Sequence, residues 1–130
     1  MQIVIDASAV LAVLLNEASK PDIIQATVGA EIVSPASLSW EVGNALSANV
    51  KKKRISPEQA LAAAHEYYTI DIRLIDIDIE EAIQLSNTHN IYAYDAYVLL
   101  CAASLKSPLL CLDGPMTNLA KSMGIVIIEV

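Results

Sequence analysis

The 130-residue chain has few positive charges and many negative ones. It contains 8 lysine and arginine residues against 15 aspartate and glutamate residues, which gives a net charge of −7 at pH 7. This balance argues against a protein that binds nucleic acid chiefly through a basic surface. Four of the basic residues are consecutive, from Lys51 to Arg54. They suit a solvated helix end, where the macrodipole favours positive charge, as well as they suit a phosphate-contacting patch.

Other absences exclude further classes of protein. The four glycines are scattered, so no glycine-rich loop is present to bind a nucleotide phosphate. The two cysteines, Cys101 and Cys111, lack the spacing of a zinc site and are typical of reduced core residues. No apolar run reaches the ~18 residues that a membrane span requires, and the N-terminus lacks the basic segment of a secretory signal. We therefore expect a cytoplasmic protein that does not enter a membrane.

The apolar residues that are present come in short segments. Phenylalanine is absent, yet the hydrophobic content is 55%, enough to bury a core in one domain spanning residues 1–130. Apolar strand patterns alternate with helical patterns along the chain. The expected strands are 2–6, 31–33, 70–77, 109–112 and 125–130, and the expected helices are 8–16, 21–29, 37–54, 56–69, 78–89, 95–105 and 116–122. This alternation predicts a three-layer α/β/α fold with a parallel sheet of about five strands.

Four acidic residues adjoin apolar stretches in this pattern. Asp6 and Asp113 follow expected strands, and Glu41 and Asp95 lie near the starts of expected helices. In a parallel sheet, the carboxyl ends of the strands and the N-termini of the following helices share one edge, where ligands bind. Carboxylates beside apolar packing are costly unless a cation or several hydrogen-bond donors satisfy them. The four positions together therefore predict one shared metal site.

Each acid also has a purely structural interpretation. Asp6 could cap the helix that follows it, and Asp95 could be an N-cap as well. Glu41 could be an exposed first-turn glutamate, favoured by the helix dipole. Asp113 precedes Gly114, and Asp-Gly is a common turn signal. The metal-site hypothesis depends on all four acids converging.

The segments that contain these acids resemble the PIN-domain ribonucleases, in particular the VapC-type toxins of prokaryotic toxin–antitoxin pairs. The resemblance covers the whole chain and is carried by Ile-Val-Ile-Asp-Ala-Ser at 3–8, Glu-Val-Gly-Asn-Ala-Leu at 41–46, Tyr-Asp-Ala-Tyr at 94–97 and Leu-Asp at 112–113. It implies that the four acids are catalytic and bind Mg²⁺ or Mn²⁺. It also implies that Ser8 and Asn44 line the site. Many members carry threonine or serine where this chain has Cys111.

The resemblance implies an endoribonuclease that hydrolyses RNA phosphodiesters by in-line attack of a metal-activated water. It further implies a PIN-like fold, a small VapB-like antitoxin that blocks the acidic site, and a homodimer. Two other functions remain open from the residues. One is a non-catalytic PIN-fold binding module that receives a partner's basic side chain. The other is an aspartyl-phosphate phosphotransfer domain, which would need a second acid beside Asp6 and a lysine near a later strand end.

Overall fold

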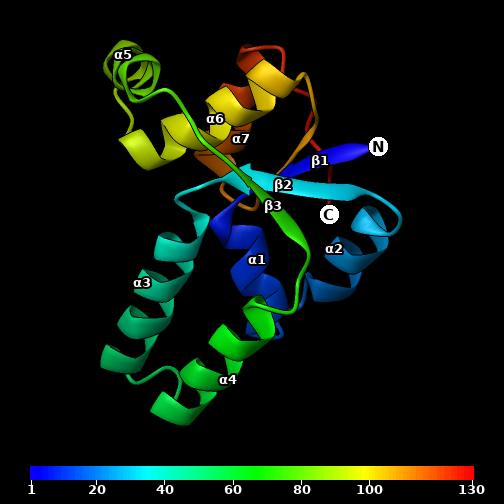
Figure 1. The fold of residues 1–130 in the computed structure, drawn as a ribbon, viewed down its shortest axis with the longest axis vertical. Coiled ribbons are helices and arrows are strands. Elements are labelled where there is room, and N and C mark those ends of the chain that lie inside the picture. Colours follow the sequence, from blue (N-terminus) through cyan, green and yellow to red (C-terminus); the bar gives the residue numbers. More distant parts are fainter.

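A parallel sheet with the strand order β3-β2-β1-β4 organises the computed structural model, which describes residues 1–130 (Figure 1). The strands are β1 Gln2–Ile5, β2 Glu31–Pro35, β3 Ile72–Ile75 and β4 Leu109–Leu110. Every neighbouring pair is parallel. Strand β3 is only partly buried and lies at one edge of the sheet.

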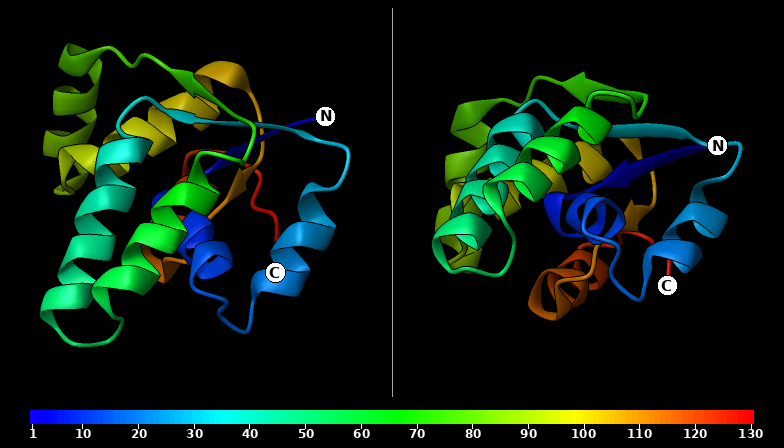
Figure 2. Two further views of the ribbon diagram at one scale, coloured as in Figure 1. Left: turned by 60° about the horizontal axis from the view of Figure 1, so that its bottom comes forward. Right: turned by 90° about the horizontal axis from the view of Figure 1, so that it is seen from below.

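Helices cover both faces of this sheet (Figures 1 and 2). They are α1 Ala7–Leu14, α2 Lys20–Thr27, α3 Leu38–Lys51, α4 Pro57–Tyr67, α5 Ile79–His89, α6 Ala93–Leu105 and α7 Gly114–Ser122. Ile3 and Ile5 of β1 pack into a core cluster with α1 to α4, whereas Val4 packs into a second cluster with α6 and α7. Because successive side chains of a strand point to opposite faces, one short strand supplies both cores. The predicted three-layer α/β/α fold is confirmed.

The sheet has four strands rather than about five. The expected strand at 125–130 is reduced to a single parallel bridge between Ile127 and Leu109, supported by hydrogen bonds from Leu109 to Val126 and from Ile128 to Leu109. Its only possible partner is the two-residue β4, which offers too short a ladder for a full strand. The segment still extends the sheet beyond β4.

Local signals account for most helix ends. Ser56 caps α4 and forms the predicted capping box with Gln59, and Asn90 ends α5 in the left-handed conformation. Helices α6 and α7 each start two residues earlier than predicted. Helix α6 begins at Ala93, so Asp95 lies inside its first turn and is not the N-cap. None of the helices is both long and apolar enough to cross a membrane.

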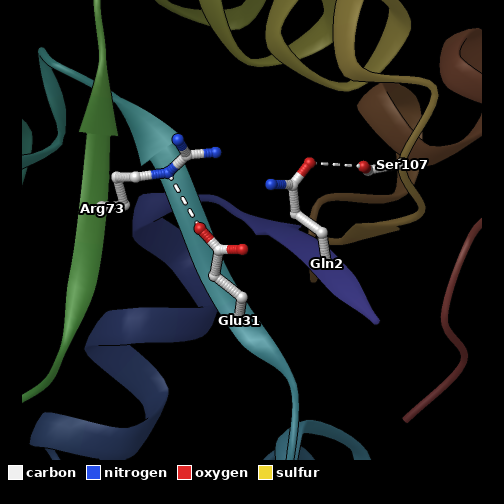
Figure 3. Close-up of polar contacts among 4 residues, drawn as sticks. All are labelled: Gln2, Glu31, Arg73 and Ser107. Atoms are coloured by element: carbon white, nitrogen blue, oxygen red, sulfur yellow. Dashed lines mark hydrogen bonds and ion pairs between the residues drawn. The ribbon is translucent and has the colours of Figure 1, made fainter.

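Polar contacts tie the strands together at the edge where they begin (Figure 3). The Arg73 guanidinium of β3 pairs with the Glu31 carboxylate of β2 at 2.9 Å, and the Ser107 hydroxyl donates to Gln2 Oε1 at 3.0 Å. The ion pair is more than half exposed, so it contributes little to stability. The opposite edge, where the strands end, carries the predicted acids.

Candidate active site

The four acids follow the carboxyl edge of the sheet. Asp6 comes directly after β1, and Asp113 comes three residues after the end of β4. Glu41 lies in the first turn of α3, which follows β2, and Asp95 lies in the first turn of α6. Two of the carboxylates are destabilised by the charge of the others: Asp6 and Asp95 act on Glu41, and Asp113 and Asp6 act on Asp95. The structure therefore places the four predicted residues in one region.

Asp6 is the most enclosed of the four, at 5% exposed. Its Oδ1 accepts hydrogen bonds from the Ser8 hydroxyl at 2.7 Å and from the Ala9 backbone N–H at 3.2 Å. Burial raises the pKa of Asp6 above its usual range, against the opposing effect of these donors. Asp6 is thus also the N-cap of α1, so the structural interpretation of this residue is correct alongside its place in the acid cluster.

Ser8 joins the ends of two strands. While its hydroxyl donates to Asp6, its oxygen accepts from the backbone N–H of Leu112 at 3.0 Å. This contact links the segment after β1 to the segment after β4, 104 residues apart. Ser8, a predicted site-lining residue, therefore orients the Asp6 carboxylate and fixes the backbone next to Asp113.

Asp113 is exposed and serves as the N-cap of α7. Its carboxylate accepts from the Met116 backbone N–H at 2.9 Å. The Asp113-Gly114 pair thus begins a helix directly. Of the four acids, Asp113 is the one most exposed to solvent, although its charge still raises the pKa of Asp95.

Glu41 and Asp95 are half-buried acids in an unfavourable electrostatic setting. Burial, followed by repulsion from Asp6 and Asp95, raises the pKa of Glu41 to about 7, although a hydrogen bond from Ser37 opposes the rise. Burial and repulsion from Asp113 and Asp6 likewise raise the pKa of Asp95. Because its side chain is half-buried, Glu41 is not the exposed first-turn glutamate of the structural interpretation. Asn44, one turn after Glu41 on α3, is exposed.

No basic side chain of the chain neutralises these acids. Its two ion pairs, Arg73 with Glu31 and Lys121 with Glu129, involve none of them. Uncompensated carboxylates with raised pKa values suit a divalent cation, and hard oxygen donors suit Mg²⁺ or Mn²⁺. No three acidic, histidine or cysteine side chains are close enough together to hold a metal ion as they stand. The residues fit such an ion by charge and donor type, and binding would require side-chain rotation.

Comparison with known proteins identifies the family. The PIN domain model matches residues 3–121, which contain all the segments that carry the resemblance. The chain belongs to the PIN domain family. It is also 31% identical to Ribonuclease VapC12 of Mycobacterium tuberculosis over 124 residues, which are 94% of this chain and 92% of the relative.

Solved structures support the PIN fold. PAE2754 from Pyrobaculum aerophilum matches with a TM-score of 0.73 and 21% identity, over 99% of this chain and 85% of the other. VapBC2 from Rickettsia felis, solved bound to a DNA fragment from their promoter, matches with a TM-score of 0.69 and 11% identity, over 98% of both chains. At these identities the likeness concerns the fold, and it agrees with the three-layer architecture.

At Cys111 this chain departs from the many PIN-domain ribonucleases that carry threonine or serine at this position. A hydroxyl at this position could orient a ligand, and a thiol is a weaker donor. In the structure the buried thiol contacts the backbone of Asp113: it donates to the Asp113 carbonyl oxygen at 3.8 Å, and the Asp113 N–H donates to Cys111 Sγ at 3.3 Å. Burial, followed by the nearby Asp6 charge, raises the pKa of the thiol to about 12, so it stays protonated as a donor. The cysteine thus helps to hold the backbone of Asp113 at the start of α7.

Two further residues of the PIN domain lie near the acids: Ser37, which was not predicted, and Arg54, which belongs to the basic run for which a phosphate-contacting patch is one of two interpretations. The Ser37 hydroxyl donates to Glu41 Oε2 at 3.4 Å. A Ser-x-x-x-Glu spacing at a helix start could have suggested this contact, because residues four apart share a helix face. Arg54 lines a groove of about 430 Å³ together with Ser8 and Leu112. The tetrad Lys51 to Arg54 therefore reaches the neighbourhood of the acids through its last member.

Proposed function

We propose that this PIN domain is an endoribonuclease toxin of the VapC type, which hydrolyses RNA phosphodiesters with Mg²⁺ or Mn²⁺ at the four acids. The observation that carries the proposal is the group of mutually repelling carboxylates at the strand ends, with no basic partner. The ribonuclease assignment is supported by the relative VapC12, which matches over nearly the whole chain.

Each residue of the site would have a separate role. Asp6, Glu41 and Asp95 would hold the ion, with Asp113 completing the site. The ion, when bound, would neutralise phosphate charge and activate the attacking water. Ser8 keeps the Asp6 carboxylate oriented, and its hydrogen bond has a short length of 2.7 Å. Asn44, exposed on the same helix as Glu41, would donate an amide hydrogen bond to the substrate.

Charge defines how RNA would approach. A chain with a net charge of −7 repels a polyanion, so attraction must come from the bound ion and from local positive charge. Arg54 supplies such a charge in the groove that it shares with Ser8, in which the other charged lining residue is Glu17. A guanidinium can bind a phosphate with two parallel hydrogen bonds. We assign Arg54 the role of contacting a phosphate of the bound strand.

The acidic site also suggests how the toxin would be controlled. An antitoxin with a basic segment would supply the missing counter-charge to the acids and exclude both the ion and RNA. A VapB-like partner fits this description, and the homology with VapC12 supports it. A homodimer remains a prediction of the family resemblance.

The deciding experiment is cleavage of a total RNA pool in Mg²⁺ or Mn²⁺, with EDTA as the metal-free arm. The wild-type protein should cut RNA only with the ion, and Asp6→Asn and Asp95→Asn should lose cleavage while keeping the wild-type circular dichroism spectrum. Glu66→Gln, which changes an exposed glutamate on α4, is the matched control and should cut normally. Equal cleavage by Asp95→Asn would overturn the assignment.

One observation favours the non-catalytic alternative. No three potential ligands lie within reach of one ion, and Asp113 is already occupied as a helix cap. A binding module would use the same acids to receive a partner's lysine or arginine. Such a protein would leave RNA intact under all conditions and would show no stabilisation by Mg²⁺ or Mn²⁺, so the same assay separates the two functions.

A further inference from the structure

A second groove opens beside Glu41, since it is lined by Ser37 and Trp40. Its volume is about 430 Å³, which lies within the range of small-molecule sites. Its lining residues come from the end of β2, the turn into α3, the first turn of α3, the segment between β3 and α5, the start of α5, and α6: Pro35, Ala36, Ser37, Trp40, Asp76, Ile77, Ile79 and Tyr97. Ser37 both lines this groove and donates to Glu41. We call it the Trp40 groove.

Trp40 is the most unusual side chain of the groove. It is the only tryptophan of the chain, it is 75% exposed, and it directly precedes Glu41. A large ring left in water at a concave site is typical of a binding surface. Exposing an apolar ring to water is unfavourable, and the folded chain leaves three quarters of Trp40 uncovered. Something outside the folded chain is therefore expected to cover it.

A second aromatic ring lines the same groove from another helix. Tyr97 belongs to α6, two residues after Asp95, and its ring meets that of Tyr94 edge to face at 5.8 Å between centroids. Trp40 and Tyr97 are therefore carried by the two helices that also carry Glu41 and Asp95. A ligand in the groove would lie next to the acids.

The charge of the groove selects the kind of ligand. Among its lining residues there is no lysine, arginine or histidine, and the only charged one is Asp76. A phosphate would be repelled there, whereas a flat uncharged base can stack on an aromatic ring. Two apolar isoleucines and a proline complete the walls. The groove thus suits the base of a nucleotide rather than its phosphate.

Resting on the proposed ribonuclease function, we propose that the Trp40 groove binds a guanine base next to the scissile phosphate, stacked on Trp40 and Tyr97 and recognised by Asp76. A carboxylate offers two acceptor oxygens and no donor. The Watson–Crick edge of guanine presents two adjacent donors, N1–H and the N2 amino group. Adenine, cytosine and uracil each present donors on only one such group. The groove would therefore determine which RNA positions are cut.

The single tryptophan makes the binding directly measurable. The Asp95→Asn variant, which should bind RNA without cutting it, is titrated with the pentaribonucleotides UUGUU, UUAUU, UUCUU and UUUUU. Trp40 emission should fall and saturate, at the lowest concentration with UUGUU. Introducing Asp76→Asn into this variant should remove the preference for guanine, because an amide presents one acceptor and one donor group in place of two acceptors.

Affinities of labelled UUGUU, measured by fluorescence anisotropy, test the stacking itself. Trp40→Ala in the same background should weaken binding by about five- to a hundredfold, and Trp40→Phe should recover most of the loss. Tyr68→Ala is the matched control, since Tyr68 is 82% exposed but lies at the end of α4 outside the groove. It should bind as the parent does.

The outcomes separate this proposal from the one on which it rests. If wild-type protein cuts RNA but Trp40 emission is unchanged by every oligonucleotide, the base site is wrong and the ribonuclease stands. If Trp40→Ala turns a dimer into a monomer in light scattering and leaves oligonucleotide affinity unchanged, the groove is an interface between copies and the base site is overturned. If the wild type cuts no RNA, the ribonuclease proposal is what fails, whereas selective quenching by UUGUU would still support a base site.

Discussion

Glu41→Gln should stabilise the metal-free protein. The folded chain holds this carboxylate partly buried beside Asp6 and Asp95, with a pKa of about 7 instead of 4.5. A raised folded-state pKa adds stability that is fully present below the unfolded pKa and is lost as pH rises through about 7. Above pH 7 the folded protein therefore carries an unfavourable charge, and a neutral amide of the same size removes it.

The expected size follows from the pKa. A rise from 4.5 to about 7 corresponds to roughly 3 kcal/mol at pH 8.5. Because Glu41 is partly exposed, solvent screening reduces this figure, and we expect a gain of about 1–2 kcal/mol. At pH 5.5 the gain should shrink, since the folded carboxyl is then mostly protonated in the wild type. Urea unfolding in EDTA at both pH values, followed by Trp40 emission, measures it.

Two further measurements complete this test. Glu66→Gln, on the exposed face of α4, should change stability by less than about 0.5 kcal/mol at either pH. Adding Mg²⁺ or Mn²⁺ should stabilise the wild type and stabilise Glu41→Gln less, because ligand binding to the folded state adds to its stability. A Glu41→Gln protein that is no more stable than the wild type at pH 8.5 in EDTA would refute the electrostatic reasoning.

Three other predictions follow from individual contacts. Ser8→Ala removes the hydroxyl between Asp6 and the Leu112 N–H, so it should lower the free energy of unfolding by about 1–2 kcal/mol and reduce RNA cleavage; unchanged cleavage would exclude an orienting role. The Cys111 thiol, buried and with a pKa of about 12, should resist iodoacetamide at pH 8 until the chain is unfolded, as mass spectrometry would show. Ser56→Ala breaks the capping box of α4 and should cost about 1 kcal/mol in urea unfolding without affecting cleavage.

Much of the fold could be predicted because local signals and burial patterns agree. The continuous apolar run Ile3, Val4 and Ile5 fits a strand buried on both faces. Ser56 with Gln59 marks a helix start that the structure reproduces. The last strand could not be predicted correctly from its own residues. Whether 125–130 forms a ladder depends on the length of its partner β4, which is a tertiary property.

The nearness of the four acids could be predicted from the sequence, whereas the contacts of each one could not. The positions of Asp6, Glu41, Asp95 and Asp113 follow from the topology of a parallel sheet, so sequence order suffices to bring them to one edge. Their hydrogen bonds depend on rotamers and on neighbours distant in sequence, such as the contact from Leu112 to Ser8. The exposure of Trp40 is likewise invisible in the sequence, since Leu38 and Val42, two residues away on either side, are both buried.

Two of the four acids perform a structural task as well, and this constrains how the protein could change over evolutionary time. Asp6 and Asp113 accept the backbone N–H groups that begin α1 and α7, so replacing either by alanine would weaken a helix start as well as the acidic cluster. Asparagine caps a helix about as well as aspartate does. A descendant that gave up the chemistry but kept the fold should therefore carry asparagine, serine or threonine at these two positions, while positions 41 and 95, which cap nothing, would be free to vary.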